Sequence, residues 1–138
     1  MSDFADVAVN AASLLRSGHT SSARDAWDQA AKAAFPASAS MQTKGCPRTT
    51  FLTLCAEGAV KGLRPIGVVR NSENARHARD CLSLLARHPE YATMSPRALW
   101  TLVTNESGKA YNQQIHVILG LLRAGCLQTS PAAGIEQL

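Results

Sequence analysis

The stretch with the clearest potential for chemistry is Lys44-Gly45-Cys46-Pro47, which directly precedes an amphipathic segment. Proline is typical of the first turn of a helix, so this stretch should lie at a helix N-terminus. There, free backbone N–H groups and the helix dipole favour an anion, and Gly45 would let a ligand approach the backbone closely. We therefore predict an anion cradle formed by Lys44 and Gly45. The alternative is that Gly45 only makes a turn and Cys46 only fills a gap.

A thiol at a helix N-terminus can also act as a nucleophile, which makes Cys46 with Glu57 or His116 a candidate for an enzyme. No histidine has an obvious orienting partner in the sequence, so this is the least favoured of three functional hypotheses. The four cysteines are separated by 9, 26 and 45 residues and form no C-x-x-C pair. Neither a zinc site nor a thioredoxin-like site is indicated, and we expect no metal and no cofactor.

Positive charge gathers in the middle of the chain. Residues 61–88 contain six cationic and two acidic side chains. Their net charge of +4 equals that of the whole chain. Arg76, Arg79 and Arg87 recur at helical spacing and should share one helix face. Guanidinium groups pair well with phosphate oxygens, so this face is a candidate for anion binding. Alternatively, it is only the solvated side of an amphipathic helix. The six cations are Lys61, Arg64, Arg70, Arg76, Arg79 and Arg87.

A second polar group precedes the last apolar stretch of the chain, where Asn112 and Gln113 begin a run of three amides. Amide side chains both donate and accept hydrogen bonds, so they could read a base edge or a ribose. They could equally well face water. No aromatic residue is interleaved with the arginines, so a platform for base stacking is not indicated.

Helical periodicity dominates the elements that would position these residues. We predict an all-α fold, a compact orthogonal bundle of about six helices with one irregular Gly/Pro connector at 61–70. Residues 36–45 should form an exposed loop. Residues 1–127 should form a single domain, and 128–138 a flexible C-terminal tail. The predicted helices span about 3–17, 22–35, 47–57, 72–87 and 108–124, with a short helix beginning at Ser95-Pro96.

Composition narrows the class of protein. The chain has 138 residues, of which 46% are hydrophobic and 17% charged, so long disorder is not expected. No apolar run approaches the roughly 20 residues of a membrane span. The first residues lack the basic and apolar blocks of a secretory signal. We therefore expect a cytoplasmic protein that does not associate with membranes.

Several blocks of the sequence resemble a family of small bacterial proteins of unknown function. The K-G-C-P block at residues 44–47 is followed by an F-L-x-L-C-x-E-G block at 51–58 and by Lys61-Gly62. Residues 70–74 are similar to an Arg-Ser-x-x-Asn element with one residue inserted, and 112–114 stand where the family has Asn-Ser-Gln. The resemblance covers about residues 5–125. It implies one intact domain and no established activity.

Our leading hypothesis is a non-enzymatic binding domain whose cations converge into one concave surface that holds nucleic acid or a nucleotide. The second hypothesis is a protein–protein adaptor or inhibitor, such as a small phage or bacterial regulator of a larger assembly. It predicts an exposed apolar patch or an oligomer seam at Trp100, Tyr91 or Met94. The residues assigned to phosphate binding are Lys44, Gly45, Lys61, Arg64, Arg70, Arg76, Arg79, Asn112 and Gln113.

Overall fold

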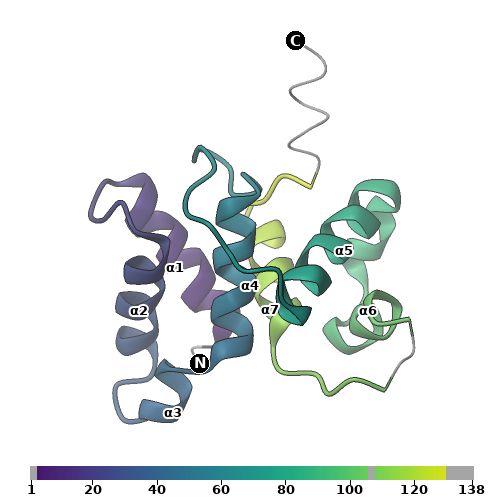
Figure 1. The fold of residues 1–138 in the computed structure, drawn as a ribbon, viewed down its shortest axis with the longest axis horizontal. Coiled ribbons are helices and arrows are strands. Elements are labelled where there is room, and N and C mark those ends of the chain that lie inside the picture. Colours follow the sequence, from purple (N-terminus) through teal and green to yellow (C-terminus); the bar gives the residue numbers. More distant parts are fainter. Residues whose placement is uncertain (1–2, 106–107, 130–138) are drawn as a thin grey trace.

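The protein is an all-α bundle, as the periodicity predicts (Figure 1). The computed structural model describes residues 3–105 and 108–129. Within them, six helices have eight residues or more, and a short α3 and one 3-10 helix complete the set. The helices are α1 (Phe4–Arg16), α2 (Ala23–Ala34), α3 (Ala39–Gln42), α4 (Gly45–Ala56), α5 (Glu73–Arg87), α6 (Pro96–Val103) and α7 (Gln114–Arg123), with the 3-10 helix at Pro89–Thr93.

Local capping explains where most of these helices begin. The side chains of Ser22, Ser72 and Ser95 accept hydrogen bonds from the backbone N–H three residues later and so begin α2, α5 and α6. Asp3 does the same for α1. Each cap satisfies one of the N–H groups that a helix start leaves without a partner. These caps agree with the helix starts predicted from the sequence.

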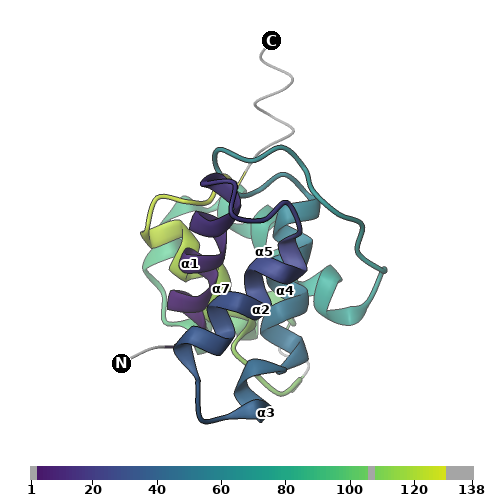
Figure 2. The same cartoon turned by 90° about the vertical axis from the view of Figure 1, so that its left-hand side faces the viewer.

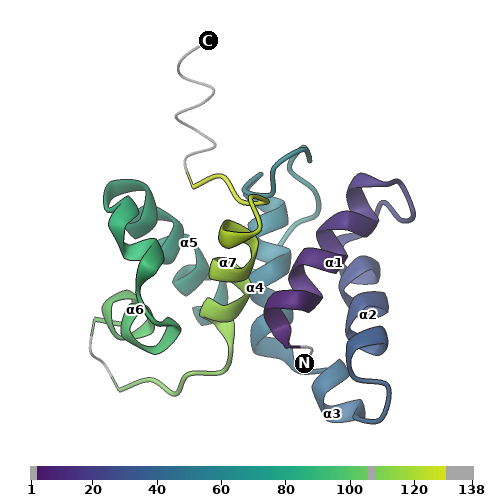
Figure 3. The ribbon, with the colours of Figure 1, turned by 180° about the vertical axis from the view of Figure 1, so that it is seen from behind.

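The helices pack around α4, which contacts α2, α5 and α7. Figure 3, the view from behind, shows α1 and α7 side by side in front of α4. The rings of Phe4, Trp27 and Phe51 form an aromatic centre between α1, α2 and α4. A Cβ placed on Gly120 of α7 would lie 2.5 Å from the Cβ of Ala5. Glycine at this position therefore permits the close approach of α1 and α7.

Two helix boundaries differ from the prediction. The last helix begins at Gln114 rather than near residue 108, because Gln113 has a left-handed backbone (φ 73°) that cannot continue a right-handed helix. The segment predicted as a loop at 36–45 contains the four-residue helix α3, which Ser38 caps. Hydrophobic periodicity reports neither a left-handed residue nor a helix of only four residues.

The irregular connector between α4 and α5 spans residues 57–72, and no helix or strand interrupts it. Its first part is anchored near the C-terminal end of α4, where the N–H of Ile66 donates to the carbonyl of Cys55 (3.0 Å). Val60 forms an isolated antiparallel bridge with Leu127. Figure 2 shows that the connector then stands out from the helices before it reaches α5.

Gln128, the first residue of the predicted tail, is hydrogen-bonded to the connector. The Gln128 N–H donates to the carbonyl of Ala59, and its side-chain amide donates to the carbonyl of Gly58, both at 2.8 Å. Gln128 therefore belongs to the folded body. Residues 130–138, the rest of the predicted tail, lie outside the described residues. Among the described residues, no helix is long and apolar enough to cross a membrane.

Candidate anion-binding site at three helix starts

The starts of α4, α5 and α7 meet through hydrogen bonds between their side chains. The Asn74 amide donates to the Cys46 sulfur (3.5 Å), and the Gln114 amide donates to the Asn74 side-chain oxygen (3.1 Å). Cys46 and Asn74 are the second residues of α4 and α5, and Gln114 is the first residue of α7. We call this place the helix-start junction and define it by these three residues. It brings together the K-G-C-P, Arg70–Asn74 and amide motifs.

Gln114 is the buried centre of the helix-start junction, with only 4% of its surface exposed. Its side-chain oxygen also accepts a hydrogen bond from the backbone N–H of Asn112 (2.8 Å). Sequence reasoning selected Asn112 and Gln113 and missed Gln114 and Asn74. The run of three amides gave no sign of which one faces inward, because the left-handed turn at Gln113 sets that orientation.

Within the described residues, the start of α4 is the one among these three at which no side chain accepts a hydrogen bond from a backbone N–H group. Its N-cap, Lys44, makes no side-chain cap, and the N–H groups of Gly45 and Cys46 meet no acceptor within the described residues. By contrast, Ser72 caps α5, and the Tyr111 hydroxyl accepts the N–H of His116 near the start of α7 (2.9 Å). Gly45 is exposed, and a Cβ there would meet nothing within 4 Å. The α4 start is therefore open to a ligand.

The charges nearby are mostly positive. Lys44 forms no ion pair within the described residues. Lys109 lies 2.6 Å from the Glu73 carboxylate, and its hydrogen bond and charge lower the pKa of that carboxyl group. Arg76 is exposed one turn into α5, and its charge lowers the same pKa to a smaller extent. Four cations and the acid Glu73 therefore lie on or beside the first turns of α4 and α5, and one of these cations, Arg48, lies 4.0 Å from Asp28 of α2.

The structure does not bring the predicted cations into one area. Lys44 and Lys61 lie beyond opposite ends of α4, whose twelve residues span about 18 Å. Arg79 is held by Glu57 (3.2 Å) and also donates to the side-chain oxygen of Asn71 (3.5 Å). Glu57 at the C-terminal end of α4 therefore has its partner on α5.

The predicted residues therefore separate into two groups. Lys44, Gly45, Asn112 and Gln113 lie at or next to the helix-start junction, and Arg76 lies one turn further along α5. Lys61, Arg64 and Arg70 lie on the connector, and all three are exposed. The two groups are candidates for different ligands, because one surrounds open helix N–H groups and the other follows an irregular chain.

The residues expected to support an enzyme are not brought to Cys46. Glu57 is the C-cap of α4, eleven residues further along the chain. The His116 ring is hydrogen-bonded to the Tyr111 hydroxyl, and burial lowers its pKa. In the described part of the chain, no three His, Cys, Asp or Glu side chains gather as a metal site would require.

The three side chains named for an exposed apolar patch or an oligomer seam are buried or partly buried. Trp100 is 5% exposed, and its indole N–H donates to the Lys109 carbonyl (2.9 Å). Tyr91 and Met94 are partly buried against the hydrophobic core. These side chains therefore contribute to the packing of the bundle.

The chain belongs to a family of unknown function, DUF6979, whose match covers residues 1–128. This agrees with the resemblance to a small family without an established activity. The match includes every helix described above, from α1 to α7. No curated protein and no solved structure matches the chain.

Proposed function

We propose that this protein is a non-enzymatic binding domain that holds a phosphate-bearing partner, a nucleotide or a nucleic acid, at the helix-start junction. One observation carries the proposal. The Cys46–Asn74–Gln114 hydrogen bonds hold three helix starts together beside the free N–H groups of Gly45 and Cys46. The positive ends of three helix dipoles then act on one small region, and such ends favour anions.

Each part of the site has a role in this proposal. The N–H groups of Gly45 and Cys46 would donate to phosphate oxygens, and the absent side chain of Gly45 leaves room for that approach. Lys44 would supply a compact positive charge, and Arg76 a guanidinium fork at the rim. The Asn112 side chain would contact the sugar or base. Arg79 is left out because Glu57 already compensates its charge.

The test is fluorescence anisotropy with two probes, a labelled ATP analogue and a labelled twelve-nucleotide single strand. Lys44→Gln and Arg76→Gln should each weaken binding about fivefold to tenfold, the range for one charged contact of roughly 1–1.4 kcal/mol. Arg87→Gln is the matched control, because Arg87 is also exposed on α5 but lies eleven residues from Arg76, about 16 Å away. Its affinity should stay unchanged.

The dependence of affinity on salt concentration provides a second test of phosphate binding. For the single strand, three phosphate contacts should weaken binding by about tenfold to twentyfold between roughly 50 and 200 mM salt. An affinity that is independent of salt would contradict the proposal. So would equal losses in the Arg76→Gln and Arg87→Gln variants, because diffuse attraction to a basic surface would then explain the binding.

The alternative role, a protein–protein adaptor, is favoured by a different surface. Val68 on the connector is 99% exposed, although valine usually lies in protein interiors. The connector also carries the second group of predicted cations.

A further inference from the structure

The outer part of the connector makes no backbone hydrogen bonds. Within the described residues, the N–H and C=O groups of residues 67–71 have no partner on either the backbone or a side chain. The chain on both sides is anchored, at Ile66 by the carbonyl of Cys55 and at Ser72 by the N–H of Arg76. A fixed segment with unpaired backbone groups resembles the free edge of a sheet, which can accept a strand from another protein.

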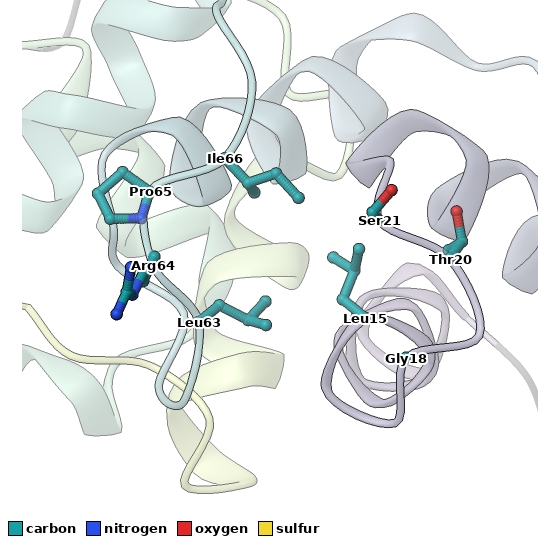
Figure 4. A pocket seen from close by; sticks show the side chains of 8 residues that line it. All are labelled: Leu15, Gly18, Thr20, Ser21, Leu63, Arg64, Pro65 and Ile66. Atoms are coloured by element: carbon teal, nitrogen blue, oxygen red, sulfur yellow. The ribbon is translucent and has the colours of Figure 1, made fainter.

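Two hollows lie along the connector and share Ser21 and Ile66, and only the second is lined by residues of the 67–71 segment. Figure 4 shows the first, of about 330 Å³, in which the side chains of Leu15, Leu63 and Ile66 point toward one another across the gap. The second, of about 370 Å³, is lined by Leu52, the start of α2 and residues 66–69. Together they form a largely apolar groove between the connector and the turn that joins α1 to α2.

The connector that forms one side of this groove is positively charged. Residues 58–72 contain Lys61, Arg64 and Arg70 and no acidic residue. Arg64 lies at the first hollow with its guanidinium directed away from the apolar side chains (Figure 4). Arg24 lines the second hollow from α2, where Asp28 lies 3.9 Å away. A ligand with apolar side chains and negative charge would match both the walls and these positive charges.

We propose that this connector groove binds an extended acidic segment of a partner protein. The segment pairs its backbone with residues 68–71, which follow the left-handed Gly67, places alternate apolar side chains into the two hollows and directs its carboxylates toward Arg64 and Arg70. Strand addition supplies affinity through the backbone, and pockets for alternate side chains supply specificity. Partner binding also covers the side chain of Val68.

An acidic peptide fits this groove better than a nucleic acid does. The lining residues of both hollows include no aromatic side chain on which a base could stack. Six of the fifteen lining residues are Leu, Ile or Val, whose side chains would contact a sugar–phosphate chain poorly. Arg64 and Arg24 supply one positive charge at each hollow, which favours an acidic ligand.

The probe is a fluorescein-labelled octapeptide of alternating glutamate and valine, blocked at both ends and measured by anisotropy. It should bind the full chain, whereas octapeptides of alternating lysine and valine or of glutamate and serine should bind at least about tenfold more weakly, a difference of roughly 1.4 kcal/mol. Val68→Ser and Arg70→Glu should each weaken binding of the acidic peptide at least about fivefold. Val69→Pro, which removes one backbone donor, should do the same.

Two controls make the result specific. Leu102→Ser removes an exposed apolar side chain on α6, 40% exposed, and should leave peptide affinity unchanged. Lys44→Gln should weaken the phosphate probes but not the peptide, so failure of this inference and failure of the proposed function are distinguishable. Thermal melts of every variant verify folding, and Val68→Ser replaces an exposed side chain and should melt like the parent chain.

Three outcomes would overturn the inference. The first is no binding of the acidic peptide by the parent chain. The second is equal binding of the lysine-valine peptide, because charge would then play no part. The third is loss of the twelve-nucleotide strand, rather than of the peptide, in the Arg70→Glu variant, which would identify the connector as a nucleic-acid surface.

Discussion

Replacing Gln114 by alanine should lower the free energy of unfolding by about 2–3 kcal/mol, because it removes two hydrogen bonds of about 1–1.5 kcal/mol each. The side chain donates to Asn74 (3.1 Å) and accepts the N–H of Asn112 (2.8 Å), and only 4% of its surface is exposed. Water therefore has little access to replace these bonds. For 138 residues, this loss corresponds to a decrease in Tm of about 7–10 °C.

The assay is urea unfolding followed by circular dichroism, with Gln29→Ala as the matched control. The Gln29 amide donates only to the exposed carboxylate of Asp25 on α2, so its loss should change the unfolding free energy by less than about 0.5 kcal/mol. Asn74→Ala should also destabilise the protein. In a double-mutant cycle, it should show a coupling energy above about 0.5 kcal/mol with Gln114→Ala.

The same substitution connects stability to binding. Gln114 touches no proposed ligand, yet it holds the starts of α5 and α7 together beside α4, so Gln114→Ala should also weaken the phosphate probe in conditions where the variant is fully folded. The reasoning would be refuted if Gln114→Ala unfolded like Gln29→Ala, since the helix-start junction would then contribute nothing to holding the three helices together.

The remaining predictions concern packing, pH and thiol access. Gly120→Ala should destabilise the protein by about 1–3 kcal/mol in thermal or urea unfolding, because the new Cβ would lie 2.5 Å from that of Ala5; Gly45→Ala, which meets nothing within 4 Å, should change stability by less than about 0.5 kcal/mol. Burial lowers the pKa of His77 below 6.5, so the unfolded chain binds more protons in this range. Stability should therefore fall as the pH drops from about 7.5 to 5.5, and His77→Phe should reduce the decrease in Tm; an unchanged decrease would contradict this assignment. Thiol titration with Ellman's reagent should label Cys46 first, because it is partly exposed and the other three free cysteines are buried; a faster reaction elsewhere, located by mass spectrometry, would contradict the structure.

The sequence was sufficient for the elements whose signals are local. Serines that cap their own helix, such as Ser22 and Ser72, act within three residues, so α2 and α5 begin close to the predicted places. The start of α7 was predicted too early because Gln113 takes a left-handed conformation and the Tyr111 hydroxyl accepts the N–H of His116. Neither feature follows from hydrophobic periodicity.

The candidate site could be predicted only in part. Lys44 and Gly45 follow from the spacing around Pro47, because a helix start is a local feature. Asn74 and Gln114 are forty residues apart in sequence and meet only after α5 and α7 have packed against α4. The ion pair of Arg79 also depends on tertiary structure, because its partner Glu57 lies at the C-terminal end of a different helix, α4.

The most direct test of the central claim is chemical-shift mapping of ¹⁵N-labelled protein during titration with ATP. If phosphate binds at the helix-start junction, the largest saturable amide shifts should occur at Gly45 and Cys46, whose N–H groups have no acceptor within the described residues. Smaller shifts should follow at the starts of α5 and α7. Saturable shifts confined to other parts of the molecule, or no shift at Gly45 and Cys46, would contradict the account.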